Sequence, residues 1–262
     1  MAATSIELSR RIEHVAAEYL LERYSGPGNP MGTEVLRVGA AVATKVPFVP
    51  QNDLMNSVHG LEDPAHLRDV LAFYGATQQP CSIHVPPYAP IALTDALARS
   101  GFRIERYAAV MVAEPVPRSR PSEVAVEEIA RTDLGVFLDT INIGFESAAA
   151  ALPVLRRNQS FWCDVPQWHL FLARVDGAPA GAGVLSVHGD IGYLAAGSVL
   201  PQFRGCGIHA ALIAARVAKA KARGCKIVTG AAAWGSQSQR NQQRAGLAIA
   251  HVKCVWTNRP AG

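Results

Sequence analysis

A chain of 262 residues with 49% apolar and 18% charged residues can bury a full hydrophobic core, which excludes a disordered protein. Its length is long for one domain and comfortable for two. The net charge of +4 is too small to indicate a nucleic acid as partner, although it favours an anionic ligand.

The first part of the chain alternates amphipathic, extended and turn-forming segments. Residues 5–24 place apolar side chains at a period of 3.6, which predicts an amphipathic helix that ends before the turn at 25–28. Three strands, a helix, a strand, a helix and a last strand are expected next, over 35–42, 44–48, 53–58, 65–74, 82–85, 91–99 and 102–112. The prolines that follow favour an inter-domain linker at 115–121.

The same kinds of element then return in a similar order. We expect a strand at 123–127, helices at 132–141 and 151–160, and strands at 168–175, 180–187 and 191–200. Asp176-Gly177 and Gly189-Asp190 supply hairpin turns between the last three. A helix up to residue 223, a strand at 225–229, a short helix at 236–244 and a strand at 247–256 complete the chain.

Targeting and redox signals point to a single compartment. No apolar run reaches the roughly 20 residues that cross a bilayer, and the N-terminus lacks the order of a signal peptide. The five cysteines form no CxxC pair, and their odd number suits free thiols better than disulfides. We therefore expect a cytoplasmic protein with no membrane partner, no nucleic-acid partner and no metal.

One offset relates the two halves of the chain. Gly205 follows Gly60 by 145 residues, and Gly246 follows Gly101 by the same number. Together with the repeated order of elements, this indicates a duplicated unit. Residues 62–64 of the first half are Glu, Asp and Pro. Two carboxylates repel a phosphate and proline removes an N–H donor, so we expect only the second half to have kept a ligand.

The turn at residues 204–209 has the features of an anion site. Gly205 and Gly207 allow positive φ angles and a close approach of the backbone to a ligand. The following helix begins with unpaired N–H groups and the positive end of its dipole. A phosphate fits such a helix N-terminus.

This stretch resembles the signature of the GNAT family of N-acetyltransferases, Q/R-x-x-G-x-G/A between a strand and a helix. The resemblance rests on Pro201, Arg204, the Gly205/Gly207 pair and Arg-Ala-Gly-Leu at 244–247. It is best over residues 122–257. It implies an α/β fold of the α+β type, with two GNAT-like domains that are each a mixed, largely antiparallel sheet flanked by helices. These are a degenerate domain at 1–114 and an acetyltransferase domain at 122–262.

The resemblance also implies acetyl-CoA as co-substrate, lying between the fourth and fifth strands of the second domain. The backbone of Val199 would face the thioester, and N–H groups of the turn would hold the pyrophosphate. The expected cofactor-binding residues are Val199, Arg204, Gly205, Cys206, Gly207, Ile208, His209 and Ala210. His209 departs from the pattern, since its ring replaces a glycine or alanine and adds a donor if protonated. Cys206 is expected to fill the loop rather than act as a nucleophile.

Candidate catalytic residues are Glu146, Tyr193 and Ser238. Attack of an amine on a thioester needs positioning, a proton acceptor and oxyanion stabilisation, but no covalent intermediate. In the family's pattern Tyr193 stands near the place of a glutamate base, and Glu146 either lines the acceptor pocket or is a solvated carboxylate. Gln242 replaces a tyrosine acid, so Ser238 or Ser236 would donate instead, with an N-cap role as the alternative for Ser236.

Other notable side chains have simpler expected roles. Trp168 is expected in the core, whereas Phe161 and Trp162 are divided between core packing and a wall of the acceptor pocket. The basic residues of the long helix, Arg216 and Lys219 among them, are expected on a solvated face.

The resemblance therefore implies an acyl-CoA-dependent N-acetyltransferase that acetylates an amine of a small molecule or protein by direct attack in a ternary complex. A catalytically silent acyl-CoA-binding or regulatory module is the alternative. A nucleotide-binding domain of another family is disfavoured, because three consecutive strands precede the glycine turn and parallel α/β folds alternate strands with helices. The sequence does not determine the oligomeric state, and a homodimer is one possible assembly.

Overall fold

The computed structural model describes residues 5–24, 26–75, 79–114, 116–117 and 123–259. Most of the expected linker at 115–121 lies outside this part of the chain. Contacts divide the chain into two compact units. Unit 1 is formed by residues 1–110 and 250–262, and unit 2 by residues 111–249.

Within the described residues, unit 1 contains three α-helices and a sheet in which the strand order is β1-β2-β3-β4-β11-β5. Its elements are α1 (Ile6–Tyr24), β1 (Glu34–Val38), β2 (Ala41–Lys45), β3 (Ser57–His59), α2 (Leu67–Gly75), β4 (Ser82–Val85), α3 (Ile91–Arg99), β5 (Arg103–Ala113) and β11 (Ala248–Thr257). Strands β3 and β4 are parallel, whereas β1–β2, β2–β3 and β4–β11 are antiparallel. The last strand of the chain therefore belongs to the sheet of unit 1.

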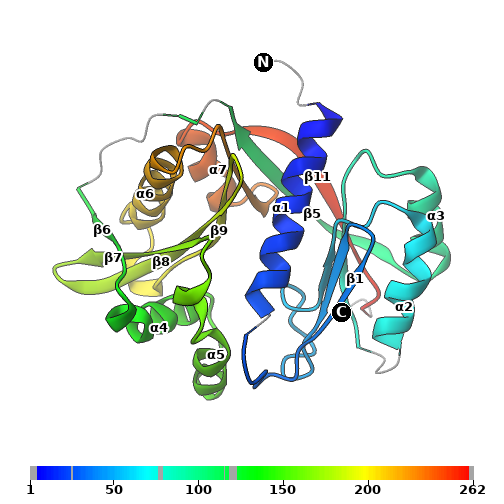
Figure 1. Ribbon diagram of the computed structural model, residues 1–262, viewed down its shortest axis with the longest axis horizontal. Coiled ribbons are helices and arrows are strands. Elements are labelled where there is room, and N and C mark those ends of the chain that lie inside the picture. The colour runs from blue at the N-terminus through cyan, green and yellow to red at the C-terminus, as the bar shows by residue number, and fades with distance from the viewer. Residues whose placement is uncertain (1–4, 25, 76–78, 115, 118–122, 260–262) are drawn as a thin grey trace. The chain divides into compact units, whose positions relative to one another are not determined.

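The two faces of this sheet differ in chemistry. Helices α2 and α3 cover one face and pack Leu67, Val70, Leu93 and Leu97 into the main apolar core, as the period-3.6 pattern predicts. Helix α1 lies on the other face (Figure 1), where its buried side chains include a carboxylate, Glu13.

Glu13 links the first helix to the last strand of the chain. Its Oε1 accepts a hydrogen bond from His251 Nε2 at 2.8 Å, and its Oε2 accepts one from Lys253 Nζ at 3.0 Å. All three side chains are buried. Burial raises the pKa of Glu13, but the charge of Lys253 and the bond from His251 outweigh it and bring the pKa down to about 2.

Unit 2 is a mostly antiparallel sheet with helices on both faces. Its elements are β6 (Ala125–Glu128), α4 (Leu134–Gly144), α5 (Leu152–Gln159), β7 (Trp168–Val175), β8 (Ala178–His188), β9 (Ile191–Val199), α6 (Ile208–Ala222), β10 (Ile227–Ala233) and α7 (Gln237–Arg244). The strand order is β6-β7-β8-β9-β10, and only β9 and β10 are parallel. Figure 1 shows α6 and α4 on opposite sides of β8 and β9. Asp176 and Gly177 both have positive φ, of 48° and 79°, as the tight turn between β7 and β8 requires.

The predicted fold class is confirmed, and the repeated order of elements is visible in the element bounds. β10, α7 and β11 begin 145, 146 and 145 residues after β4, α3 and β5. The second domain was expected to extend to residue 262, whereas unit 2 ends at residue 249. The reason is that Cys254–Thr257 of β11 pair with Ser82–Val85 of β4.

The predicted strands at 44–48 and 53–58 are mostly a hydrogen-bonded loop. Asn56 organises it, because its Oδ1 accepts from the Val46 N–H at 2.7 Å and its Nδ2 donates to the carbonyls of Val49 and Asn52, both at 2.8 Å. A buried amide that satisfies backbone groups in this way competes with strand pairing. Only Ala41–Lys45 and Ser57–His59 form strands in this region.

Candidate active site

The site begins where two parallel strands separate. β9 and β10 pair from Ile191 with Ile227 to Leu194 with Gly230. β9 then continues to Val199 and β10 to Ala233 beyond the paired register. The carboxyl ends of the two strands therefore separate, and the backbone of β9 after Leu194 can bond a ligand on this side.

A cavity of about 600 Å³ lies at this place in unit 2. Its walls come from the end of α4, the end of β9, the turn before α6, the first turn of α6 and one face of α7. The lining residues are Gly144, Phe145, Gly197, Ser198, Val199, Phe203, Arg204, Gly205, Gly207, Ile208, His209, Ala210, Gln237, Ser238, Asn241 and Arg244.

The turn before α6 has the backbone geometry of an anion site. Gly205 and Gly207 have φ angles of 84° and 76°, which side-chain-bearing residues rarely adopt. A Cβ at either position would meet no atom within 4 Å, so conformation rather than crowding requires glycine. Gly207 caps α6 without a side-chain hydrogen bond, which leaves the first N–H groups of the helix to a ligand.

The charged side chains of the cavity are cationic. Arg204 and Arg244 line it, and the described lining residues include no carboxylate. Arg204 Nη2 is 2.7 Å from Glu146 Oε1 and donates to the Gly144 carbonyl at 3.4 Å. Arg244 Nη1 donates to Asn241 Oδ1 at 3.1 Å. Both guanidinium groups are thus held close to the turn, where they favour an anionic ligand.

His209 is a neutral hydrogen-bond donor in this site. Asn241 Nδ2 donates to His209 Nδ1 at 3.0 Å, so the ring proton lies on Nε2. Burial, and then the charge of Arg216, lower the pKa of His209 to about 4. The expected donor role therefore does not need a protonated ring near pH 7.

The structure brings most of the expected cofactor residues to one cavity. Val199, Arg204, Gly205, Gly207, Ile208, His209 and Ala210 line it. Cys206 lies in the same turn with an exposed side chain, and its Sγ is 3.9 Å from the Arg204 carbonyl. Its side chain is not among the lining groups.

Of the three candidate catalytic residues, Ser238 lines the cavity, whereas Glu146 and Tyr193 are not among its lining residues. Glu146 follows α4 with a φ of 59°, and its side chain is 65% exposed and paired with Arg204. Tyr193 lies in the paired part of β9, opposite Thr229 of β10 and Ser186 of β8. The solvated carboxylate therefore describes Glu146 better than a pocket-lining base, and Ser236 is the N-cap of α7.

Gln242 occupies a tight place beside the fifth strand. Its side chain is buried, and its Oε1 has no hydrogen-bond partner within the described residues. That oxygen is 2.7 Å from the point where a Cβ on Gly230 would stand. Gly230 is the last residue of β10 that pairs with β9, so the amide lies where the two strands begin to separate.

Sequence reasoning missed the polar face of α7. Gln237, Asn241 and Arg244 line the cavity at the spacing i, i+4 and i+7, which places side chains on one face of a helix. That spacing was a usable signal.

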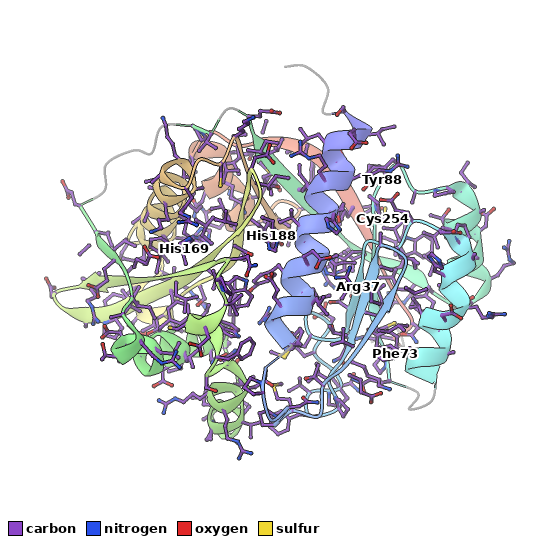
Figure 2. All side chains as sticks on the ribbon, viewed as in Figure 1. Arg37, Phe73, Tyr88, His169, His188 and Cys254 are labelled. Carbon is purple, nitrogen blue, oxygen red and sulfur yellow. The ribbon has the colours of Figure 1, made fainter. Side chains whose placement is uncertain are left out.

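Two expectations about other side chains are resolved by burial. Arg216, expected on a solvated face, is 2% exposed and lies inside unit 2. Trp162 and Trp168 make edge contacts with each other, and Trp162 also with Phe137; both tryptophans are buried. They form core rather than a pocket wall. His169 and His188, labelled in Figure 2, lie on β7 and at the end of β8, where they bond Glu128 and Ser186.

In the part of the chain that the structure covers, no helix is both long and apolar enough to cross a membrane. Among the same residues, no group of three or more His, Cys, Asp and Glu side chains is arranged to hold a metal ion.

Known proteins resemble this chain in sequence or in fold. Residues 139–245 match the model of the acetyltransferase (GNAT) family. The whole fold is similar to that of a GCN5-related N-acetyltransferase from Kribbella flavida, with a TM-score of 0.67 and 18% identity over 98% of both chains. A GCN5-related N-acetyltransferase from Sphaerobacter thermophilus gives 0.58 and 17% over 100% of this chain and 96% of that one.

A tandem GNAT protein from the clavulanic acid biosynthesis pathway also shares the fold along its length. Its TM-score is 0.58, with 13% identity over 99% of this chain and 98% of that chain. No curated protein matches the sequence. The likeness to the solved structures is therefore one of fold, and the family match rests on the segment that contains the cavity.

Proposed function

We propose that unit 2, whose residues 139–245 match the model of the acetyltransferase (GNAT) family, transfers an acetyl group from acetyl-CoA to an amine of a small molecule or protein. The observation that carries the proposal is the cavity of about 600 Å³. It joins the end of β9, beyond the part of this strand that pairs with β10, to the N-terminus of α6. An acyl-CoA needs this combination, since its diphosphate requires N–H donors and its peptide-like pantetheine arm requires a free strand edge.

Each part of the cavity fits one part of this co-substrate. The N–H groups from Gly205 to Ala210, together with Arg204 and Arg244, would hold the diphosphate. The His209 Nε2–H adds a neutral donor. The acyl end would lie against Gly197 to Val199, beyond the paired part of β9.

The chemistry asked of the protein is modest. The amine nitrogen attacks the thioester carbon, an N–C bond forms, the C–S bond breaks, and the proton of the amine leaves to solvent. Backbone N–H groups of β9 would stabilise the negative charge that develops on the carbonyl oxygen. Ser238 lines the cavity and is proposed to donate a hydrogen bond to the departing thiolate. Glu146 and Tyr193 would act only through intervening water.

A silent acyl-CoA-binding module is the second candidate. It is favoured by the described lining of the cavity, which includes no Asp, Glu, Cys or Tyr side chain, and by Gln242 at the place of a tyrosine acid. Such a module would keep the diphosphate site and lack turnover.

Two measurements on the wild-type protein separate these functions. Thermal unfolding with acetyl-CoA and with CoA reports binding, and release of free thiol over a panel of amines reports transfer. We expect stabilisation by both ligands and thiol release with at least one amine. Stabilisation without thiol release on any amine would support the silent module, and no response to either ligand would reject both functions.

A further inference from the structure

A charged residue interrupts the apolar stripe by which α6 packs on the sheet of unit 2. Residues 208, 212, 216 and 220 share one face of this helix at a spacing of four, and all four are buried. They are Ile, Leu, Arg and Ala. A helix face of this kind usually carries apolar side chains only.

Glycines on the facing strands make room for Arg216. A Cβ on Gly183 of β8 would stand 3.1 Å from the Arg216 Cζ, and a Cβ on Gly197 of β9 would stand 3.1 Å from its Nη2. Any side chain at either of these two glycine positions would therefore press on the guanidinium of Arg216. Gly197 also lines the cavity, so one residue of β9 contacts both Arg216 and the site.

The guanidinium bonds the backbone at an irregularity between β8 and β9. The pairs Gly183–Gly197 and Leu185–Leu194 enclose one residue of β8 and two of β9, which is the count of a β-bulge. Arg216 Nη1 donates to the carbonyl of Val184 at 3.2 Å and to that of Ala195 at 3.4 Å. Both acceptors belong to the bulge, one on each strand. Arg216 Nε donates to the Leu212 carbonyl in its own helix at 3.0 Å.

We propose that Arg216 is a positioning residue for acyl transfer, which holds the β9 bulge in shape so that the backbone from Ala195 to Val199 faces the acyl group. The proposal rests on the proposed function of this cavity. Arg216 lies behind the wall at Gly197 and acts through the backbone of β9, not by contact with the substrate.

Packing alone does not account for an arginine at this place. Moving a guanidinium out of water is costly, and an apolar side chain of similar volume usually fills such a space at least as well. An arginine has a fixed fork of donors that can bridge two carbonyls, which suits a bulge. Its charge also acts in the cavity, since after burial it is the next cause that lowers the pKa of His209. A positive charge behind this wall favours the oxyanion of the reaction.

The test compares Arg216→Met with Lys221→Met, which removes the same charge from an exposed position of the same helix. For Arg216→Met we expect kcat for acetyl transfer to fall about 10- to 100-fold, as for a small misplacement of reacting groups. KM for acetyl-CoA should stay within about 3-fold, because the diphosphate site is untouched. Lys221→Met should change neither parameter.

An NMR titration of His209 reports whether the charge of Arg216 acts in the cavity. With Arg216→Met, the pKa of His209 should rise from about 4 toward its ordinary value of 6.5, and it should stay below 6.5 because the ring remains buried. Hydrogen exchange of the Gly197 and Ser198 amides should become faster. Lys221→Met should leave both signals as in the wild type.

A folded Arg216→Met protein with wild-type kcat would overturn the proposal, as would an equal loss in Lys221→Met. If Arg216→Met does not fold, Gly183→Ala replaces it, since the added methyl presses on the guanidinium at a position that does not line the cavity. That variant must show the same loss of kcat, and full activity in it would also overturn the proposal. Failure of the proposed function is recognised separately, as a wild-type protein that neither binds CoA nor releases thiol.

Discussion

Gly207 concentrates the requirements of the diphosphate site in one residue. Gly207 is the N-cap of α6 and has a φ of 76°, and its N–H belongs to the turn that would hold phosphate. Gly207→Glu adds strain from the left-handed backbone and a carboxylate beside the expected anion. We expect acetyl-CoA affinity to fall by about 100-fold or more, measured by calorimetry.

Two controls separate the charge effect from general damage. Gly189→Glu introduces the same side chain at a φ of 58° in the turn after β8, where a Cβ also meets no atom within 4 Å. Its affinity for acetyl-CoA should match the wild type. Pro64→Gly, in the corresponding turn of the first half, should also change affinity little. Equal losses in Pro64→Gly and Gly207→Glu would contradict a single ligand site in unit 2.

His209 gives a prediction about pH at the same scale. Its pKa is lowered to about 4, by burial first and Arg216 second, so the ring is neutral at pH 6 and at pH 8 and gains charge only as pH falls toward 4. The ratio of acetyl-CoA affinities between wild type and His209→Ala should therefore be equal at pH 6 and pH 8, by calorimetry. Titration of the ligand's own phosphates cancels in this ratio. A ratio that grows markedly at pH 6 would show that the ring becomes charged in this range.

At the scale of elements, the loop between β2 and β3 depends on one buried amide. Asn56 bonds three backbone groups of this loop and accepts from Gln79 Nε2 at 2.5 Å. Asn56→Ala leaves the Val46 N–H and Gln79 without this acceptor. Buried donors that lose a partner cost about 1–3 kcal/mol each, so we expect the free energy of unfolding to fall by about 2–4 kcal/mol in urea.

The matched control for Asn56 lies in the same loop. Gln51 is exposed, and Gln51→Ala should change the free energy of unfolding by less than about 0.5 kcal/mol. If both variants lose the same stability, the loop would be sensitive to any change and the bonds of Asn56 would not be its support.

The same loop shows where local sequence patterns stop being informative. Residues 44–48 and 53–58 have the apolar content of strands, but the side chain that prevents most of their pairing lies at position 56 and acts on position 46. Patterns carried by neighbouring residues did predict structure, as at the Asp176-Gly177 turn and the long helix that follows Gly207. Such local patterns could not predict a hydrogen bond between a side-chain amide and a backbone group ten residues away.

The candidate site divides in the same way. Its glycine turn was found because positive φ and a helix N-terminus are local properties. Phe145 and Asn241 reach the cavity from elements far away in the sequence, and Arg216 is buried only because Gly183 and Gly197 lie opposite it. A basic residue in a helix is usually solvated. The burial of Arg216 could therefore be recognised only from the tertiary structure, even though the sequence shows that it lies four residues after Leu212, on the same helix face.

At the scale of the whole molecule, the order of the chain and its division into units do not coincide. β11 is the last strand in sequence, yet it pairs with β4 in unit 1 and supplies two partners of Glu13. A single cut at 115–121 would therefore not separate the two units. It would leave the first 114 residues with a buried carboxylate that lacks His251 and Lys253, an arrangement that costs several kcal/mol.

Acid unfolding of unit 1 should report this cluster in two overlapping pH ranges. The pKa of Glu13 is about 2 when folded against 4.5 ordinarily, so its contribution to stability is present above pH 4.5 and is lost as pH falls from 4.5 toward 2. His59 has a pKa of about 3, lowered chiefly by burial from 6.5. The unfolded chain therefore takes up a proton first, and stability also falls as pH decreases from 6.5 toward 3.

Glu13→Gln separates the contribution of Glu13 from that of the buried histidines. At pH 7 it leaves Lys253 as a buried charge without its partner, so the free energy of unfolding should fall by about 3–5 kcal/mol. Glu13→Gln combined with Lys253→Met should recover part of this loss. Urea unfolding of Glu13→Gln at several pH values should keep the decline between 6.5 and 4.5, which His59 and His84 cause, and should show a shallower decline below 4.5 than the wild type. A variant with the wild-type slope in the lower range would mean that Glu13 does not stabilise unit 1 as a carboxylate, and that β11 is held by its backbone pairing alone.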